Sequence, residues 1–233
     1  MQRFRMPRLG TTLIGLCALA LPLCVSAQIA AVNCGSLQNA YGPFDYRIYK
    51  DRHEILQVDA YHFTPLVEAL IKPMFQHFAA DFDYTLRASP NHHRALITMA
   101  RWSERVKNPM PPGARYSVDC YFDRAIRFAK DDLIVRMIYA GFLGRAGRKT
   151  DAMQQLDYVS ASAADNPFTH FNVGLAYFDL QEYDKALKEA HAAANLGLQR
   201  TELRDRLMAA GKWVEPVAPS TPGASTKATT PKP

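Results

Sequence analysis

The sequence predicts an all-α fold in which antiparallel helical hairpins stack one after another into a solenoid. Small residues recur at a fixed interval: Gly174 follows Ala140 by 34 residues, and Ala186 follows Ala152 by the same number. Apolar residues accompany them on the same period, in the spacing of amphipathic helices. With 48% hydrophobic and 21% charged residues among 233, the chain can bury a core, which excludes a wholly disordered chain or a collagen-like fibre.

Residues 1–27 have the composition of a secretory signal peptide. Three arginines precede an apolar stretch at 13–25, and Val25-Ser26-Ala27 supplies small residues where a signal peptidase cleaves. Because the stretch is shorter than the ~20 residues of a spanning helix, we expect cleavage after Ala27, a periplasmic or secreted mature chain, and no integral membrane span. An uncleaved anchor is one alternative. A lipoprotein is another, although no cysteine here follows the small residue typical of a lipoprotein box.

Export changes what the charge of the chain implies. A formal charge of +6 would suggest an anionic partner. The signal segment carries three arginines and no acid, so the remainder is only mildly basic. Since no aromatic and basic stacking motif accompanies the arginines, we expect no nucleic-acid partner.

Two cysteines remain after cleavage, Cys34 and Cys120. In an oxidising compartment an even pair is more often bonded than free. A disulfide between them would stabilise the fold by roughly 4 kcal/mol on the chain-entropy model. Because the sequence gives no distance between the sulfurs, two separate buried thiols are the alternative.

Residues 28–63 form an aromatic-rich N-terminal arm. Tyr41, Phe44, Tyr46 and Tyr49 lie within nine positions of one another. This density of aromatic residues favours burial, so we expect the arm to lie against the helical stack. The alternative is that these side chains form a docking surface for another chain.

Residues 64–92 follow as a helical flank or degenerate repeat. Thr64-Pro65 has the pattern of an N-cap followed by proline at the first helical position. The segment 65–88 predicts a helical pair or one broken helix that ends before Ser89-Pro90.

Residues 93–200 resemble the tetratricopeptide repeat, in copies at 93–132, 133–166 and 167–200. The first copy is longer because the prolines of 108–113 extend the turn between its helices. The family pattern places a large apolar and a small residue at positions 7 and 8, an aromatic residue at 11, and small residues at 20 and 27. The third copy meets this pattern with Val173, Gly174, Tyr177, Ala186 and Ala193. The Trp and Pro that the family has at positions 4 and 32 are missing.

Two stretches outside these copies carry a second resemblance. Residues 41–47 and 81–95 look like segments of a group of small exported bacterial repeat proteins, to which no established activity attaches.

The chain ends in two further elements. Residues 201–213 predict a capping helix that carries Leu203, Leu207 and Met208 on one face and stops at Gly211. Residues 214–233 include five Pro, four Thr and two Ser and lack apolar periodicity, which predicts a disordered tail.

The repeat resemblance implies a concave groove lined by the first helix of each copy. Its lining would be basic at one end and aromatic at the other, which suits an extended or helical peptide with acidic and apolar residues. The alternative is that the arginines are only solvated and the phenylalanines pack on the capping helix. The side chains expected to contact the partner are Arg94, Arg101, Arg105, Met137, Arg145, Phe171, Leu175 and Phe178.

The candidate catalytic patterns are weak, and we expect no catalytic, cofactor-binding or metal site. The adjacent residues His92 and His93 would point about 100° apart on a helix and chelate one metal poorly. Asp131 and Asp132 lie at a helix start, where negative charge is favourable in any case. The sequence therefore predicts a scaffold, not an enzyme, that binds another envelope protein or peptide segment. A binder of cell-wall or surface polysaccharide, using exposed aromatic residues, is the alternative.

Overall fold

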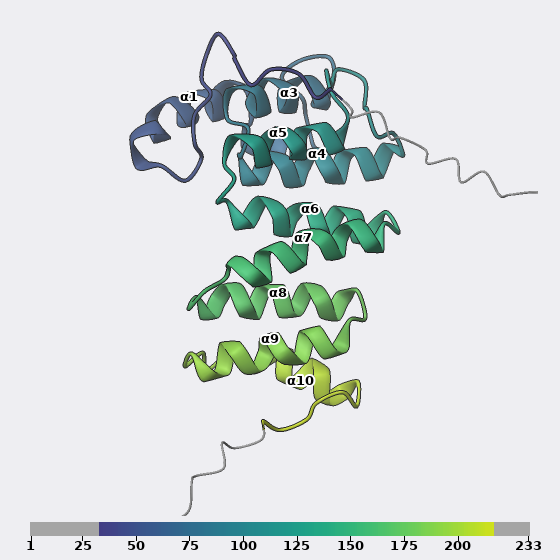
Figure 1. Ribbon diagram of the computed structural model, residues 1–233. Coiled ribbons are helices and arrows are strands. Elements are labelled where there is room, and N and C mark those ends of the chain that lie inside the picture. The colour runs from purple at the N-terminus through teal and green to yellow at the C-terminus, as the bar shows by residue number, and fades with distance from the viewer. Residues whose placement is uncertain (1–32, 217–233) are drawn as a thin grey trace, which may run out of the picture. The chain divides into compact units, whose positions relative to one another are not determined.

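The computed structural model describes residues 33–216, which fold into helices without a strand in that range (Figure 1). The all-α prediction is confirmed for this part of the chain. The predicted signal peptide and all but the first three residues of the predicted tail lie outside the described residues. The elements are η1 (Tyr49–Asp51, a 3-10 helix), α1 (Arg52–His62), α2 (Pro65–Glu68), α3 (Phe78–Ala88), α4 (His93–Val106), α5 (Val118–Phe128), α6 (Leu133–Arg145), α7 (Lys149–Ser162), α8 (Pro167–Asp179), α9 (Tyr183–Asn195) and α10 (Glu202–Ala209).

Helices α6 to α9 form two hairpins, α6 with α7 and α8 with α9, which follow each other in Figure 1. Helix α6 also packs on α4 and on α8, so the first helices of successive pairs lie side by side. Helix α6 begins at Leu133 and α8 at Pro167, the residues where the repeat register places the second and third copies. Side chains fix both starts, because Asp132 accepts from the Val135 amide and Asn166 from the amides of α8.

The arm is more helical than expected, and the flank after it is helical as predicted. Helix α1 occupies part of the predicted arm, where aromatic clustering gave no helical period. The segment 65–88 forms a helical pair, α2 and α3. The N-cap prediction is confirmed, because the Thr64 hydroxyl accepts from the Val67 amide and Pro65 begins α2.

Helix α10 covers the end of the last hairpin. Leu203 and Leu207 are buried against α8 and α9. Met208 was expected on the same face, but its side chain is 53% exposed, because residue 208 lies about 100° around the helix from Leu207. The helix ends at Ala209, and Gly211 follows with a positive φ of 65°.

The two helices of the last hairpin approach most closely where the side chains are smallest. A Cβ added to Gly174 of α8 would lie 3.4 Å from the Ala186 carbonyl oxygen and 2.3 Å from Leu203 Cδ2. Ala186 is itself fully buried, as are Ala140 and Ala152 in the preceding hairpin. Gly174 therefore lets α9 pack closely on α8 and also makes room for α10.

A buried acid joins the second hairpin to the first. Glu189 of α9 is 2% exposed, and such a carboxylate needs partners. Ser160 Oγ of α7 donates to its Oε1 at 2.5 Å, and His170 Nδ1 of α8 lies 2.6 Å from its Oε2. His170 Nε2 lies 2.8 Å from the Ala164 carbonyl oxygen. Because both ring nitrogens face acceptors, only the protonated imidazole can donate both bonds.

We expect Gly174→Ala to lower the free energy of unfolding by about 1–3 kcal/mol, because the added methyl group overpacks Leu203. Gly141→Ala on α6 is the matched control. There a Cβ meets only the flexible end of Arg145 at 3.4 Å, so better helix propensity should raise stability by about 0.5–1 kcal/mol. Urea unfolding measures both, and equal stabilisation by the two changes would contradict the close packing at Gly174.

The His170 contact predicts a pH dependence of stability. Burial alone would lower the pKa of His170, but the hydrogen bonds to Glu189 and the Ala164 carbonyl outweigh it and raise this pKa above 6.5. A pKa that is higher in the folded chain than in the unfolded chain contributes stability. This contribution is fully present below pH 6.5 and is lost as the pH rises through the folded-state pKa. From pH 5.5 to pH 8.5, the free energy of unfolding should therefore fall more for the native chain than for His170→Gln. An equal fall in both chains would exclude this contribution.

Candidate functional site

The surface formed by α4, α6 and α8 carries the predicted groove residues, and it is recessed between α6 and α8. A pocket of about 370 Å³ lies there, floored in part by the buried Leu156 of α7. Two glycines one turn apart on α6 border it, and a Cβ on Gly144 would lie 2.8 Å from Leu180 Cδ2. At Gly141 the missing side chain leaves open space, because a Cβ there would meet only Arg145 Nη1 at 3.4 Å, whereas Leu180 fills the space beside Gly144. Its other lining residues are Ala140, Arg145, Ala176, Asp179 and Leu180.

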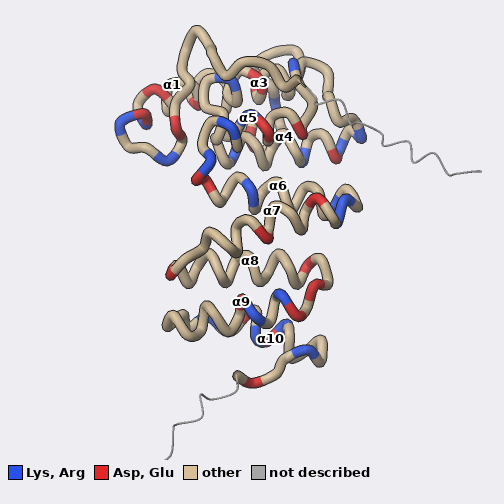
Figure 2. Tube along the Cα trace, viewed as in Figure 1, with Lys and Arg blue, Asp and Glu red and all other residues tan. Residues whose placement is uncertain are grey.

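Two charged residues, Arg145 and Asp179, line this pocket, whereas α6 and α8 otherwise carry few charges (Figure 2). Arg145 Nε donates to Glu104 Oε1 of α4 at 2.9 Å, and Asp179 accepts from Arg206 of α10 at 2.7 Å. The side chains of both pairs are 33–63% exposed, so each pair contributes little stability. An incoming charged group can therefore exchange with these partners at small cost.

The basic end of the predicted groove is partly neutralised within the chain. Arg94 Nε donates to Glu68 Oε1 at 2.7 Å, and its guanidinium also lies over the Phe63 ring. Arg105 lies over Trp102. Arg101 is exposed and has no ion pair within residues 33–216.

The aromatic end differs from the expectation of an open surface. Phe171 is 2% exposed, because α10 and the end of α9 enclose it. The guanidinium of Arg206 lies 4.5 Å from the Phe178 ring centroid. Leu175 and Met137 are half-buried and pack against the core. The capping helix therefore covers part of this end, although Phe168 stays 57% exposed, and the hollow on this surface is the recess between α6 and α8.

The two sequence stretches outside the repeats meet in the structure. The Phe44 amide donates to the Ala88 carbonyl oxygen at 2.8 Å, and the Tyr46 amide donates to Asn91 Oδ1 at 3.0 Å. The Tyr46 ring lies 4.1 Å from the His92 ring, centroid to centroid. A Cβ on Gly42, whose φ is +92°, would lie 2.3 Å from the Ala88 carbonyl oxygen. These stretches therefore dock the arm on α3 and α4, as expected for the arm as a whole, although Tyr49 stays 90% exposed.

The histidine and aspartate doublets take part in this docking. His92 Nδ1 accepts from the Ala95 amide at the start of α4. His93 Nε2 lies 2.8 Å from Asp132 Oδ2, which also accepts from Asn91 at 2.9 Å. Asp131 pairs with Arg47 of the arm. Among residues 33–216, no group of three or more His, Cys, Asp or Glu is arranged to hold a metal ion.

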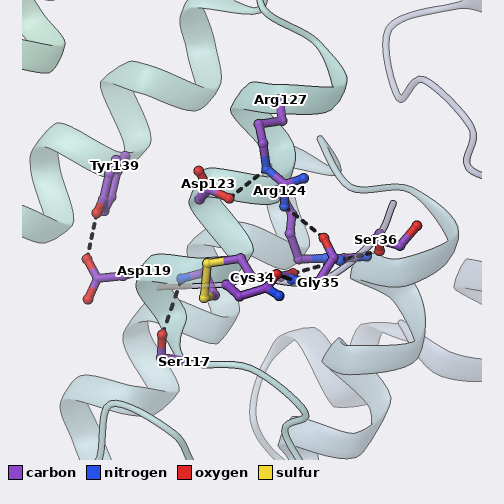
Figure 3. The surroundings of a disulfide bond; sticks show 11 residues. Cys34, Gly35, Ser36, Ser117, Asp119, Asp123, Arg124, Arg127 and Tyr139 are labelled. Atoms are coloured by element: carbon purple, nitrogen blue, oxygen red, sulfur yellow. Dashed lines mark hydrogen bonds and ion pairs between the residues drawn. A yellow bond between two sulfur atoms is a disulfide. The ribbon is translucent and has the colours of Figure 1, made fainter. Parts of the chain in front are cut away.

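A disulfide and a buried arginine fix the start of the arm (Figure 3). Cys34 is bonded to Cys120 of α5 across a sequence separation of 86 residues. One turn after Cys120, the buried Arg124 donates to the Cys34 and Ser36 carbonyl oxygens at 3.0 and 2.6 Å. Burial lowers the pKa of Arg124, and the nearby Arg127 adds to this effect. The sequence suggested the disulfide from the even number of cysteines and the expected export to an oxidising compartment, whereas nothing in it marked Arg124.

Comparison of the chain with family models, curated proteins and solved structures finds no match. No helix among residues 33–216 is both long and apolar enough to cross a membrane.

We expect Cys34→Ala with Cys120→Ala to lower the free energy of unfolding by about 4 kcal/mol, because an 86-residue loop is no longer closed in the unfolded chain. Limited proteolysis should then cleave first within residues 33–51, while α6 to α9 stay protected. Unchanged stability and an uncut arm would show that Arg124 and the polar contacts suffice to hold it.

Proposed function

We propose that the chain is an exported scaffold of the tetratricopeptide-repeat type and that its α4–α6–α8 surface binds a segment of another envelope protein. The start of α8 34 residues after that of α6, and the close packing at Gly174, support the repeat assignment. The observation that most supports a binding site on this surface is the recess of about 370 Å³ between α6 and α8.

The chemistry of the recess favours a segment with apolar and acidic residues. Its floor is made of Ala140, Leu156 and Ala176, which can bury one apolar side chain. Positive charge for an acidic neighbour comes from Arg145 on the rim and from Arg101 on α4, which has no ion pair within residues 33–216. A segment that combines the two is therefore complementary to this surface.

A selection of linear peptides displayed on phage against the full chain tests the proposal. We expect enriched peptides to combine acidic and large apolar residues, and synthetic copies to bind in calorimetry. Gly141→Leu should weaken binding about tenfold or more, because the new side chain fills the recess. Gln154→Leu is the matched control, since it adds the same side chain at an exposed position of α7 outside the recess.

Two results would contradict the proposal. One is that selection against this chain enriches no peptide family beyond those that a parallel selection against an unrelated helical protein enriches. The other is that the enriched peptides bind Gly141→Leu and Gln154→Leu equally well, which would place their site elsewhere on the chain.

A further inference from the structure

A second pocket, remote in sequence from the recess, lies where α1 and α3 pack together and the arm passes them. Its volume is about 210 Å³. Three tyrosines, a histidine and a glutamine make up most of its lining, and none of them belongs to the predicted groove. The lining residues are Tyr41, Gln57, Val58, Tyr61, His62 and Tyr84.

The aromatic wall of this pocket is held rigidly. His62 stacks on Tyr84 with ring centroids 3.7 Å apart, and on Phe75 with centroids 5.3 Å apart. Its Nδ1 is buried and lies 4.0 Å from Asp81 Oδ1. The hydroxyl of Tyr41 donates to Glu54, which fixes that ring as well.

One ring is left open to solvent. Tyr61 is 69% exposed although it lines the pocket. Gln57, also exposed, lies one helical turn before it on the same face of α1. An aromatic face and an amide therefore stand side by side at the mouth of the pocket.

No Asp, Glu, Lys or Arg is among the residues that line the pocket. The charged residues Glu54 and Arg87 outside this lining are already hydrogen-bonded: Glu54 accepts from the Tyr41 hydroxyl, and Arg87 donates to Asp83 Oδ2 and to Asn39 Oδ1 at 2.9 and 3.0 Å. Burial, with a smaller contribution from Arg87, lowers the pKa of His62 despite the nearby Asp81. A charged peptide or an anionic lipid would therefore meet no oppositely charged Asp, Glu, Lys or Arg in the lining of this pocket.

We propose that this pocket binds a neutral sugar residue of an oligosaccharide. A sugar ring combines an apolar C–H face, which can stack on Tyr61, with hydroxyl groups, which can bond to the Gln57 amide and the tyrosine hydroxyls. The pocket supplies both kinds of contact and no ionic one. The site is independent of the recess between α6 and α8, so the chain would hold a glycan through its N-terminal part and a protein segment through its repeats.

Calorimetric titration of the full chain tests this inference. The probes are hexasaccharides of β-1,4-linked glucose and of β-1,4-linked N-acetylglucosamine, with a hexasaccharide of uronic acid as the charged comparison. At least one neutral probe should bind, and the charged one should not. Tyr61→Ala should weaken that binding about tenfold, because the stacking face is lost, whereas Tyr61→Phe should retain it.

Tyr49→Ala is the matched control, because Tyr49 is 90% exposed and lies outside the pocket. It should bind like the native chain. Circular dichroism checks that Tyr61→Ala still folds, as its exposure leads us to expect. Failure of both neutral probes to bind, or equal weakening by Tyr61→Ala and Tyr49→Ala, overturns the proposal. Neither result bears on the peptide site, which Gly141→Leu tests separately.

Discussion

The close approach of α9 to α8 at Gly174 is the constraint on which the rest of the repeat region depends. A Cβ added there would lie 2.3 Å from Leu203 Cδ2 and 3.1 Å from Glu189 Cβ, so a larger side chain would displace α10 or α9. Gly174 also leaves room for Leu203 of α10, so the same glycine allows the close packing of α9 and of the capping helix. The surface of first helices that results is recessed between α6 and α8, where Gly141 of α6 has no side chain.

The sequence was most informative where structure follows from local rules. The small residues at 140, 152, 174 and 186 predicted packing that their burial agrees with, and Thr64-Pro65 predicted a helix start that the structure confirms. What it could not supply were contacts between distant segments. The docking of Tyr46 on His92, and the carbonyl oxygens that Arg124 binds, join residues that are 46 and 88–90 positions apart.

The candidate site shows the same division. The repeat resemblance placed Arg145 on the groove, and the structure groups Arg145 with Gly141, Gly144 and Asp179 around one pocket. The resemblance also placed Phe171 and Phe178 on the groove, but α10 encloses the first and Arg206 lies over the second. A repeat pattern describes one hairpin and its neighbours, and it carries no information on how a capping helix closes the end. The tyrosine pocket was missed because its residues come from three segments with no shared period.

Hydrogen exchange on the complex with a selected peptide reports where the chain becomes protected. If the peptide binds in the recess, backbone amides in 137–145 of α6 and 173–179 of α8 should exchange more slowly, with α1 and α9 unchanged. Protection confined to α7, α9 or the arm, with α6 and α8 exchanging as in the free chain, would contradict it.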